Sequence, residues 1–481
     1  MPTKSSTTNS KMKDLSFFAL FSLTFGSMMG SGVFDIPQNI ANRAGAIAVV
    51  THWIIVAIGM IALGWSFLYI SNKRPDIKSG IYGYAKFGFG DFVGFNSAWG
   101  YWLNAVLGNA SYLIYIFATL GDFFVIFGHG NSAGITTAAL IWESVLVWVV
   151  YILIAIGIKE ASFVNVIITT IKILALTTIV VVFCYGFHWH TFKVNMSTSD
   201  LRLGSMLDQI KSTMLVTVWD FLGIEAACIY ALHAKSMKDV GRATMLATHL
   251  VLIIDFLISV LPFGIMSTTA VQGLSTPSAA GVMSQVIGAV SANIIRGSVI
   301  ICVVGALLAW QMLATNILYV SAIDKTMPKY LTKLNSKLVP SASLLVSSLT
   351  LQLFIICAHY TGAIYLNMIQ IATSLILVPY LLAALFAFKL IITHKVVHYY
   401  ELIKGSLAVV YAVWLIYAGG LKYLAISSLM YAVGIFIFGK ARHEARKKLF
   451  VNKAELVIFL VILITAAISG MLWWKGTLVL D

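Results

Sequence analysis

Charged residues are scarce in this chain. Only 10% of its 481 residues are Asp, Glu, Lys or Arg, whereas hydrophobic residues make up 60%. A soluble domain usually carries about 25% charged residues, so the composition excludes an ordinary soluble protein. We therefore expect an all-α, polytopic membrane protein, because helices satisfy their own backbone groups inside a bilayer.

Cysteine is also rare and is not spaced for a disulfide framework or a metal site. We expect free, small core residues at all four positions, Cys184, Cys228, Cys302 and Cys357. The pair His188 and His190 has no nearby carboxylate or cysteine, so we predict no metal and no cofactor. No catalytic constellation is apparent, so we do not expect an enzyme.

Long apolar runs dominate what is present. A membrane-spanning helix needs roughly 20 apolar residues, and by that rule the chain has twelve or thirteen such helices. The thirteen segments are 15–41, 44–71, 91–127, 134–157, 161–187, 207–234, 240–267, 285–321, 342–359, 363–392, 403–420, 422–439 and 455–474.

This count divides the chain into five parts. They are an N-terminal tail (1–14), a transport core of ten helices (15–392), helices 11 and 12 (403–439), a basic segment (440–454), and an extra helix with the C-terminal tail (455–481). The polar start shows no cleavage pattern, so we expect no signal peptide.

Positive charge alternates between successive loops. The loops after even-numbered helices include NKRPDIKSGIYGYAKFG, HAKSMKDVGR, DKTMPKYLTKLNSK and GKARHEARKK, whereas the opposite loops include GHGNSAG and STTAVQGLSTPSAAG. By the positive-inside rule, the first set and the N-terminus are cytoplasmic. The net charge of +14 therefore points to a membrane surface and not to nucleic acid.

The first segment contains FGSMMGSGVF, in which Gly26, Gly30 and Gly32 lie close together before Pro37. Each glycine weakens a helix by about 1 kcal/mol relative to alanine, so we predict local unwinding there. Interrupted helices near the midplane are typical of secondary transporters, whose half-helix ends bind the charged groups of the substrate. Close helix packing is the alternative role for such glycines.

The sixth segment contains WDFLGIEAA, with Asp220 and Glu225 on either side of Gly223. Acids inside a bilayer are expensive and are functional-site candidates by default. Two interrupted helices five segments apart predict two five-helix units related by an inverted repeat.

A polar stripe marks the third segment. Tyr101, Asn104, Gly108 and Tyr112 share one helical face, with Asn109 at its flank. We expect this stripe to face a cavity, and interhelical hydrogen bonding is the alternative.

Together, GSGVF, the WxFxGxE pattern of WDFLGIEAA, GALLAW and AIDKTMP resemble the basic amino acid/polyamine antiporters of the amino acid–polyamine–organocation superfamily. The resemblance covers nearly the whole chain. It implies a five-plus-five inverted-repeat core with helices 1 and 6 interrupted. It also implies sodium-independent exchange of an external amino acid for an internal product, either a decarboxylated amine or ornithine.

The resemblance also implies site residues. Backbone N–H groups of Gly30, Ser31 and Gly32 would hold the substrate carboxylate. The remaining substrate contacts, including those from the polar stripe, are Ser27, Met28, Asn104, Asn109, Trp219 and Trp310. Glu225 would gate the site with Tyr101 and Tyr380. Lys172 matches a lysine at the sodium position of proton-coupled relatives, with snorkelling to the membrane surface as the alternative.

Two acids depart from the family pattern. Asp220 stands where we expect a small or apolar residue, and Asp35 lies one turn beyond the carboxylate loop, in what we predict is a vestibule. An acidic patch beside an anion site favours a cationic amino acid and its amine. Histidine/histamine exchange is our first hypothesis, ahead of lysine/cadaverine, arginine/ornithine or agmatine, and tyrosine/tyramine. Proton-coupled symport is the other alternative.

These inferences define the expected surroundings of the protein. We expect a multi-pass protein of a bacterial plasma membrane whose partners are amino acid and amine substrates, the lipid bilayer and, as a candidate, a second copy in a homodimer. A channel would need a continuous polar pore, and a sensor usually carries a soluble signalling domain, so neither class fits the interrupted helices as well.

Overall fold

The computed structural model describes residues 15–128, 133–197, 203–361, 365–394, 396, 398–451 and 453–475. Within these ranges the regular elements are helices, and the one β-type pairing is an isolated bridge between Leu15 and Ala234. The predicted N-terminal tail, 1–14, and residues 476–481 of the predicted C-terminal tail lie outside the described residues.

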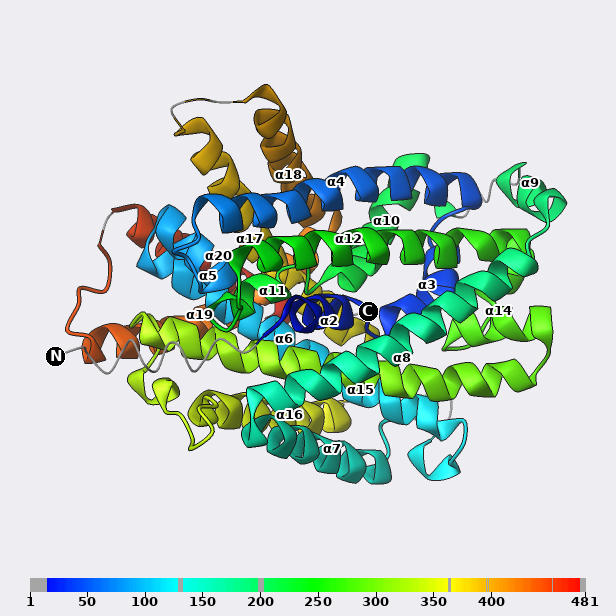
Figure 1. Cartoon of the computed structure of the whole chain (residues 1–481), viewed down its shortest axis with the longest axis horizontal. Helices are drawn as coiled ribbons and strands as arrows, with labels where there is room; N and C mark the ends of the chain where they lie inside the picture. Colours follow the sequence, from blue (N-terminus) through cyan, green and yellow to red (C-terminus); the bar gives the residue numbers. More distant parts are fainter. Residues whose placement is uncertain are drawn as a thin grey trace.

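The chain runs through long helices joined by short elements (Figure 1). The α-helices are α2 Phe17–Met28, α3 Gly32–Ala41, α4 Ala46–Lys73, α5 Gly80–Phe89, α6 Asp91–Gly121, α7 Thr137–Ile156, α8 Ile158–Tyr185, α9 Trp189–Ser197, α10 Met206–Phe221, α11 Ala226–Ile229, α12 Met237–Val260, α13 Thr268–Gln272, α14 Ser278–Ile287, α15 Val290–Ile323, α16 Ser341–Thr361, α17 Tyr365–Ile392, α18 Tyr399–Ala418, α19 Leu421–Glu444 and α20 Lys453–Trp474. The 3-10 turns are η1 Val125–Phe127, η4 Tyr230–Leu232, η5 Leu261–Gly264 and η6 Lys329–Thr332.

Twelve helices in the described part of the chain are long and apolar enough to cross a membrane. The count becomes thirteen if α10 and the α11–η4 segment, which are bent by 43° at their junction, form one span. The predicted number of twelve or thirteen is therefore confirmed. In the extra helix, α20, only 11% of the most apolar 18-residue stretch is buried inside the protein, so most of its surface is available to lipid.

Several predicted loops contain helices. α5 and α9 lie in stretches that the sequence assigns to loops, α14 begins in such a loop and ends inside the predicted segment 285–321, and α19 continues to Glu444, beyond the predicted boundary at residue 439. α5 forms because it packs against α6 and α17 and buries Ile81, Tyr82 and Tyr84. Tertiary packing of this kind stabilises short helices that a search for long apolar runs does not detect.

The interrupted helices lie at the centre of the bundle. α6 and α15 pack along each other, and α2 contacts α8, α12 and α15 (Figure 1). The most apolar 18-residue stretch of α6 is 89% buried inside the protein, whereas that of a peripheral helix such as α7 is 28% buried. This surrounding shell of helices removes both helix breaks from lipid, which is the condition for non-helical backbone at membrane depth.

Candidate substrate site

The two helix breaks touch each other. α2 ends at Met28 and α3 begins at Gly32, while α10 ends at Phe221 and α11 begins at Ala226. The Ser27 hydroxyl donates hydrogen bonds to the Thr24 carbonyl at 3.0 Å and to the Gly223 carbonyl at 3.4 Å. Both predicted interruptions are therefore present, and they are joined side by side.

Gly223 is required at its position for two reasons. Its φ of +103° lies in the region that favours glycine. In addition, a Cβ atom at this residue would lie 2.3 Å from the Ser27 hydroxyl. The weak point in the sixth segment thus serves both backbone conformation and close approach.

Lys172 lies at the first break. Its ammonium group donates to the carbonyls of Gly26 at 2.9 Å and Met29 at 2.5 Å. These carbonyls belong to the C-terminal end of α2, where a cation is favourable. The side chain is fully buried, so the alternative that it snorkels to the membrane surface is wrong.

Glu225 connects the second break to α17. The Tyr380 hydroxyl donates to its carboxylate at 2.6 Å and accepts a hydrogen bond from the Gly223 N–H at 3.2 Å. Tyr101, on α6, lies near enough to Glu225 to interact with its carboxylate. The three residues predicted to form a gate are thus brought together.

Two aromatic pairs flank the first break. The indole of Trp310 donates to the Ser27 carbonyl at 3.0 Å, and its ring lies 5.8 Å from that of Tyr101. Trp219 lies 5.6 Å from Tyr112. A Cβ on Gly30 would come within 2.3 Å of the Tyr112 hydroxyl, so that ring rests directly on the loop.

The two asparagines of α6 make interhelical hydrogen bonds. The amide of Asn104 donates to the Ala372 carbonyl at 2.8 Å, and the amide of Asn109 donates to Gln311 on α15 at 3.0 Å. This is the alternative that the sequence left open for the polar stripe. Their carbonyl oxygens remain without a partner in the described structure. The sequence did not single out Gln311.

Asp220 lies against Gly32. A Cβ on Gly32 would be 1.9 Å from one carboxylate oxygen of Asp220 and 2.8 Å from the ring of Trp219. The side chain of Asp220 is fully buried, and neither oxygen has a hydrogen-bond partner in the described structure. The acid that departs from the family pattern therefore lies at the end of α10 and packs against the first break.

Asp35 differs from the prediction. It is buried, and it accepts hydrogen bonds from the Tyr115 hydroxyl at 2.7 Å and the Ser278 N–H at 2.9 Å. These contacts join α3 to α6 and α14. Because its side chain is enclosed by donors, Asp35 does not line an open vestibule in this conformation.

Sequence reasoning named Asp35, Asp220 and Glu225 but missed a further buried acid, Asp255 on α12. It is fully buried, and both of its oxygens lack a partner among the described residues. A signal was available, since Asp255 interrupts the apolar run LVLIIDFLISV. The rule that drew attention to Asp220 applies equally to this residue.

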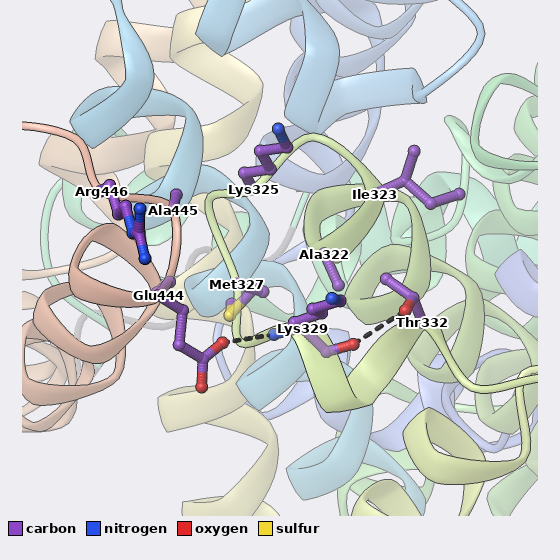
Figure 2. A pocket seen from close by; sticks show the side chains of 10 residues that line it. Ala322, Ile323, Lys325, Met327, Lys329, Thr332, Glu444, Ala445 and Arg446 are labelled. Carbon is purple, nitrogen blue, oxygen red and sulfur yellow. Dashed lines mark hydrogen bonds between the residues drawn. The ribbon is translucent and has the colours of Figure 1, made fainter.

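A cavity of about 350 Å³ opens elsewhere, between the end of α15, η6 and the end of α19 (Figure 2). Lys325, Lys329, Glu444 and Arg446 are among its lining residues, and Glu444 accepts from the Lys329 N–H at 2.7 Å. It begins at Ala322, roughly 18 Å along α15 from Trp310 at 1.5 Å per residue. This cavity is therefore separate from the helix breaks.

Comparison with known proteins gives a consistent result. The family described as "Amino acid permease" matches residues 15–475. The chain is 39% identical over 477 residues to the arginine/ornithine antiporter of Pseudomonas aeruginosa, covering 96% of this chain and 98% of that protein. It is 35% identical to the putative arginine/ornithine antiporter of Escherichia coli K12, covering 94% of this chain and 98% of that protein. It is 34% identical to the arginine/agmatine antiporter of Chlamydia caviae, covering 95% of this chain and 96% of that protein.

Proposed function

Because this chain belongs to the amino acid permease family, and within it to the basic amino acid antiporters, we propose that it exchanges a cationic amino acid for a related cationic product. Relatives named for arginine/ornithine and arginine/agmatine exchange support arginine as the amino acid. Ornithine or the decarboxylated amine would leave in return. Family membership establishes a transporter and not an enzyme.

One observation in the structure carries the choice of a cation. The carboxylate of Asp220 is buried at the first helix break with no hydrogen-bond partner among the described residues. A buried carboxylate without donors is costly. An ammonium, guanidinium or imidazolium group would supply both charge and N–H donors, and the family's aromatic residues Trp219 and Trp310 would cover it.

For the remaining site residues we propose the roles that the sequence analysis assigned to them. The loop Gly30–Gly32, with Ser27 and Met28 beside it, would receive the substrate carboxylate at the N-terminus of α3. Glu225, Tyr101 and Tyr380 would close one side of the site. Lys172 would hold the α2 end in place of a sodium ion. Asn104 and Asn109 would contribute through their free carbonyl oxygens.

Histidine/histamine exchange remains a prediction. The relatives' names favour arginine instead, although Asp220 would accept an imidazolium as well as a guanidinium. The other pairs, lysine/cadaverine and tyrosine/tyramine, carry a cationic amine and stay in the test. A homodimer and a cytoplasmic N-terminus likewise remain predictions.

Counterflow in liposomes tests the proposal. Purified protein is reconstituted into vesicles loaded with ornithine, agmatine, histamine, cadaverine or tyramine, and uptake of the labelled amino acid is followed. We expect arginine uptake that requires internal ornithine or agmatine. If only histidine is taken up rapidly, and only into histamine-loaded vesicles, the transported amino acid is histidine and not arginine. If no pair is exchanged, the proposal is contradicted.

A second liposome experiment distinguishes proton-coupled symport from exchange. Vesicles without internal substrate receive an inwardly directed proton gradient, and the same labelled amino acids are added outside. An exchanger accumulates none of them under these conditions. Accumulation would instead indicate proton-coupled uptake.

A further inference from the structure

The cavity of about 350 Å³ between the end of α15, η6 and the end of α19 has no part in the proposed exchange. Its size is within the range of roughly 300–1,000 Å³ that small-ligand sites have. Lys325 and Lys329 line it from the α15–η6 side, and Glu444 and Arg446 line it from the α19 side (Figure 2). The Glu444 carboxylate accepts a hydrogen bond from the Lys329 N–H at 2.7 Å. The lining thus holds three cations and one acid that is already engaged.

The three cations have no partner among the described residues. The side chains of Lys325, Lys329 and Arg446 form no ion pair and no hydrogen bond in that part of the chain. Arg442, about one turn earlier on α19, shows the usual arrangement, since it is paired with Asp91 at 2.6 Å. Like charges gathered around one cavity repel each other, so an anion inside it would be favourable.

Lys325 stands just beyond the end of α15 in a left-handed backbone conformation, with a φ of +62°. Its N–H donates to the Ala322 carbonyl at 3.0 Å, and the Thr326 N–H donates to the Ser321 carbonyl at 3.1 Å. This is the Schellman pattern, in which backbone N–H groups satisfy the last carbonyls of a helix. The ammonium group of Lys325 is therefore not needed to cap these carbonyls.

α19 ends in the same way at Arg446, whose φ is +52°. The Arg446 N–H donates to the His443 carbonyl at 3.1 Å, and the Lys447 N–H donates to the Arg442 carbonyl at 3.0 Å. Glycine is the usual residue at this left-handed position, because a Cβ atom is strained there. Outside glycine, only Leu338 shares a positive φ with these two cations in the described part of the chain. Strained residues cluster at ligand sites, and here two of them border one cavity.

The cavity also lies at the end of two membrane-spanning helices. Both α15 and α19 are long and apolar enough to cross a bilayer, and the loops after them, DKTMPKYLTKLNSK and GKARHEARKK, are rich in Lys and Arg. The apolar residues of the lining are Ala322, Ile323, Met327, Ala441 and Ala445. Basic pockets between membrane helices bind anionic lipid headgroups. This position and this mixed lining favour a phosphate ester that carries hydrocarbon chains.

We propose that the cavity binds a phosphate group, supplied by the headgroup of an anionic phospholipid or by free phosphate. Lys325 and Arg446 donate to it from the two helix ends, and Lys329 donates from η6. Charge-assisted hydrogen bonds of this kind are strong, and a guanidinium group can form two in parallel with one phosphate. The Glu444 carboxylate, held by the Lys329 N–H, would accept a hydroxyl of the headgroup. The site is independent of the proposed exchange.

Native mass spectrometry of the purified full-length protein tests the site. Protein freed of lipid in detergent is titrated with phosphatidylglycerol, and with phosphatidylcholine of the same acyl chains. We expect one saturable phosphatidylglycerol site whose affinity exceeds that for phosphatidylcholine by about fivefold or more, since each cation near an anionic headgroup contributes about that factor. In a second titration, inorganic phosphate competes with the bound lipid. Displacement would add free phosphate as a source, whereas retention of the lipid would assign the site to the headgroup alone.

Substitutions at the two helix ends remove the charge without harming the backbone. Lys325→Gly and Arg446→Gly place glycine where the left-handed conformation favours it, so both variants should keep their melting temperature. Each should lose about fivefold in phosphatidylglycerol affinity, and together they should lose about twentyfold or more. Lys329→Gln should also lose about fivefold, whereas Lys329→Arg should bind normally because the charge remains.

Lys333→Gln is the matched control. Lys333 is an exposed cation directly after η6 that does not line the cavity, so this variant should bind phosphatidylglycerol as the unaltered protein does. Equal losses in Lys333→Gln and Lys329→Gln would show diffuse attraction to a basic surface and would overturn the site. Undiminished binding in the double glycine variant would overturn it as well, as would the absence of binding by either probe, phosphatidylglycerol or inorganic phosphate.

Discussion

A carboxylate oxygen of Asp220 occupies the space in which Gly32 would carry a Cβ, only 1.9 Å from that position. The glycine is thus required by the acid packed against it. Gly32→Ala should force apart α3 and α10, since overpacking of a dense core costs about 1–3 kcal/mol. We expect counterflow to fall by more than about tenfold and the melting temperature to drop.

The control for this substitution is Gly297→Ala on α15, where an added Cβ would meet nothing within 4 Å. That variant should keep both activity and melting temperature. Full activity in Gly32→Ala would contradict the close contact between Asp220 and Gly32.

Lys172 should be needed to hold the first helix break. Lys172→Met removes the donor for the carbonyls of Gly26 and Met29, and an unpaired buried polar group costs about 1–3 kcal/mol. We expect a lower melting temperature together with impaired counterflow. Lys238→Met, at an exposed position on α12, is the control and should change neither. Normal stability in the Lys172 variant would show that water or a shifted side chain replaces the ammonium group.

Tyr380 and Glu225, which share a hydrogen bond, should be energetically coupled. Tyr380→Phe leaves a carboxylate oxygen and the Gly223 N–H unpaired, at a cost of about 1–3 kcal/mol. In a cycle with Glu225→Gln we expect a coupling energy of about 1 kcal/mol or more, measured by unfolding in detergent.

Tyr431→Phe provides the comparison, because the Tyr431 hydroxyl is also buried but donates to the Leu375 carbonyl at 2.7 Å. It should destabilise the protein without coupling to Glu225. Additive effects of Tyr380→Phe and Glu225→Gln would argue against a shared contact.

Trp310 should contribute to substrate affinity through the position of its ring. Trp310→Phe removes the hydrogen bond to the Ser27 carbonyl and frees the ring from the first break. We expect the apparent affinity for arginine in counterflow to fall by about three- to tenfold, the loss of a hydrogen bond worth about 1 kcal/mol. Trp102→Phe breaks a comparable bond to Ser347 at 2.9 Å but should affect stability alone. The same loss of affinity in both variants would assign Trp310 a purely structural role.

Local sequence patterns were sufficient for some parts of the site. The glycines of FGSMMGSGVF and of WDFLGIEAA predicted where helices 1 and 6 are interrupted, because the conformational cost of glycine is local. Short helices such as α5 were not predicted, because their stability depends on burial against α6 and α17. The polar stripe on α6 was detected, but whether it faces a cavity or a neighbouring helix depends on where α15 and α17 lie.

The sequence by itself determined the membrane class, the number of spans, the two interruptions and the family. These follow from hydrophobicity, length and backbone propensity, which act over a few neighbouring residues. Only the tertiary structure decided which buried acids have partners. Asp35 and Glu225 receive donors from other helices, whereas Asp220 and Asp255 receive none from the residues that the structure describes. The reason is that a hydrogen bond between residues far apart in the chain exists only once the helices are packed.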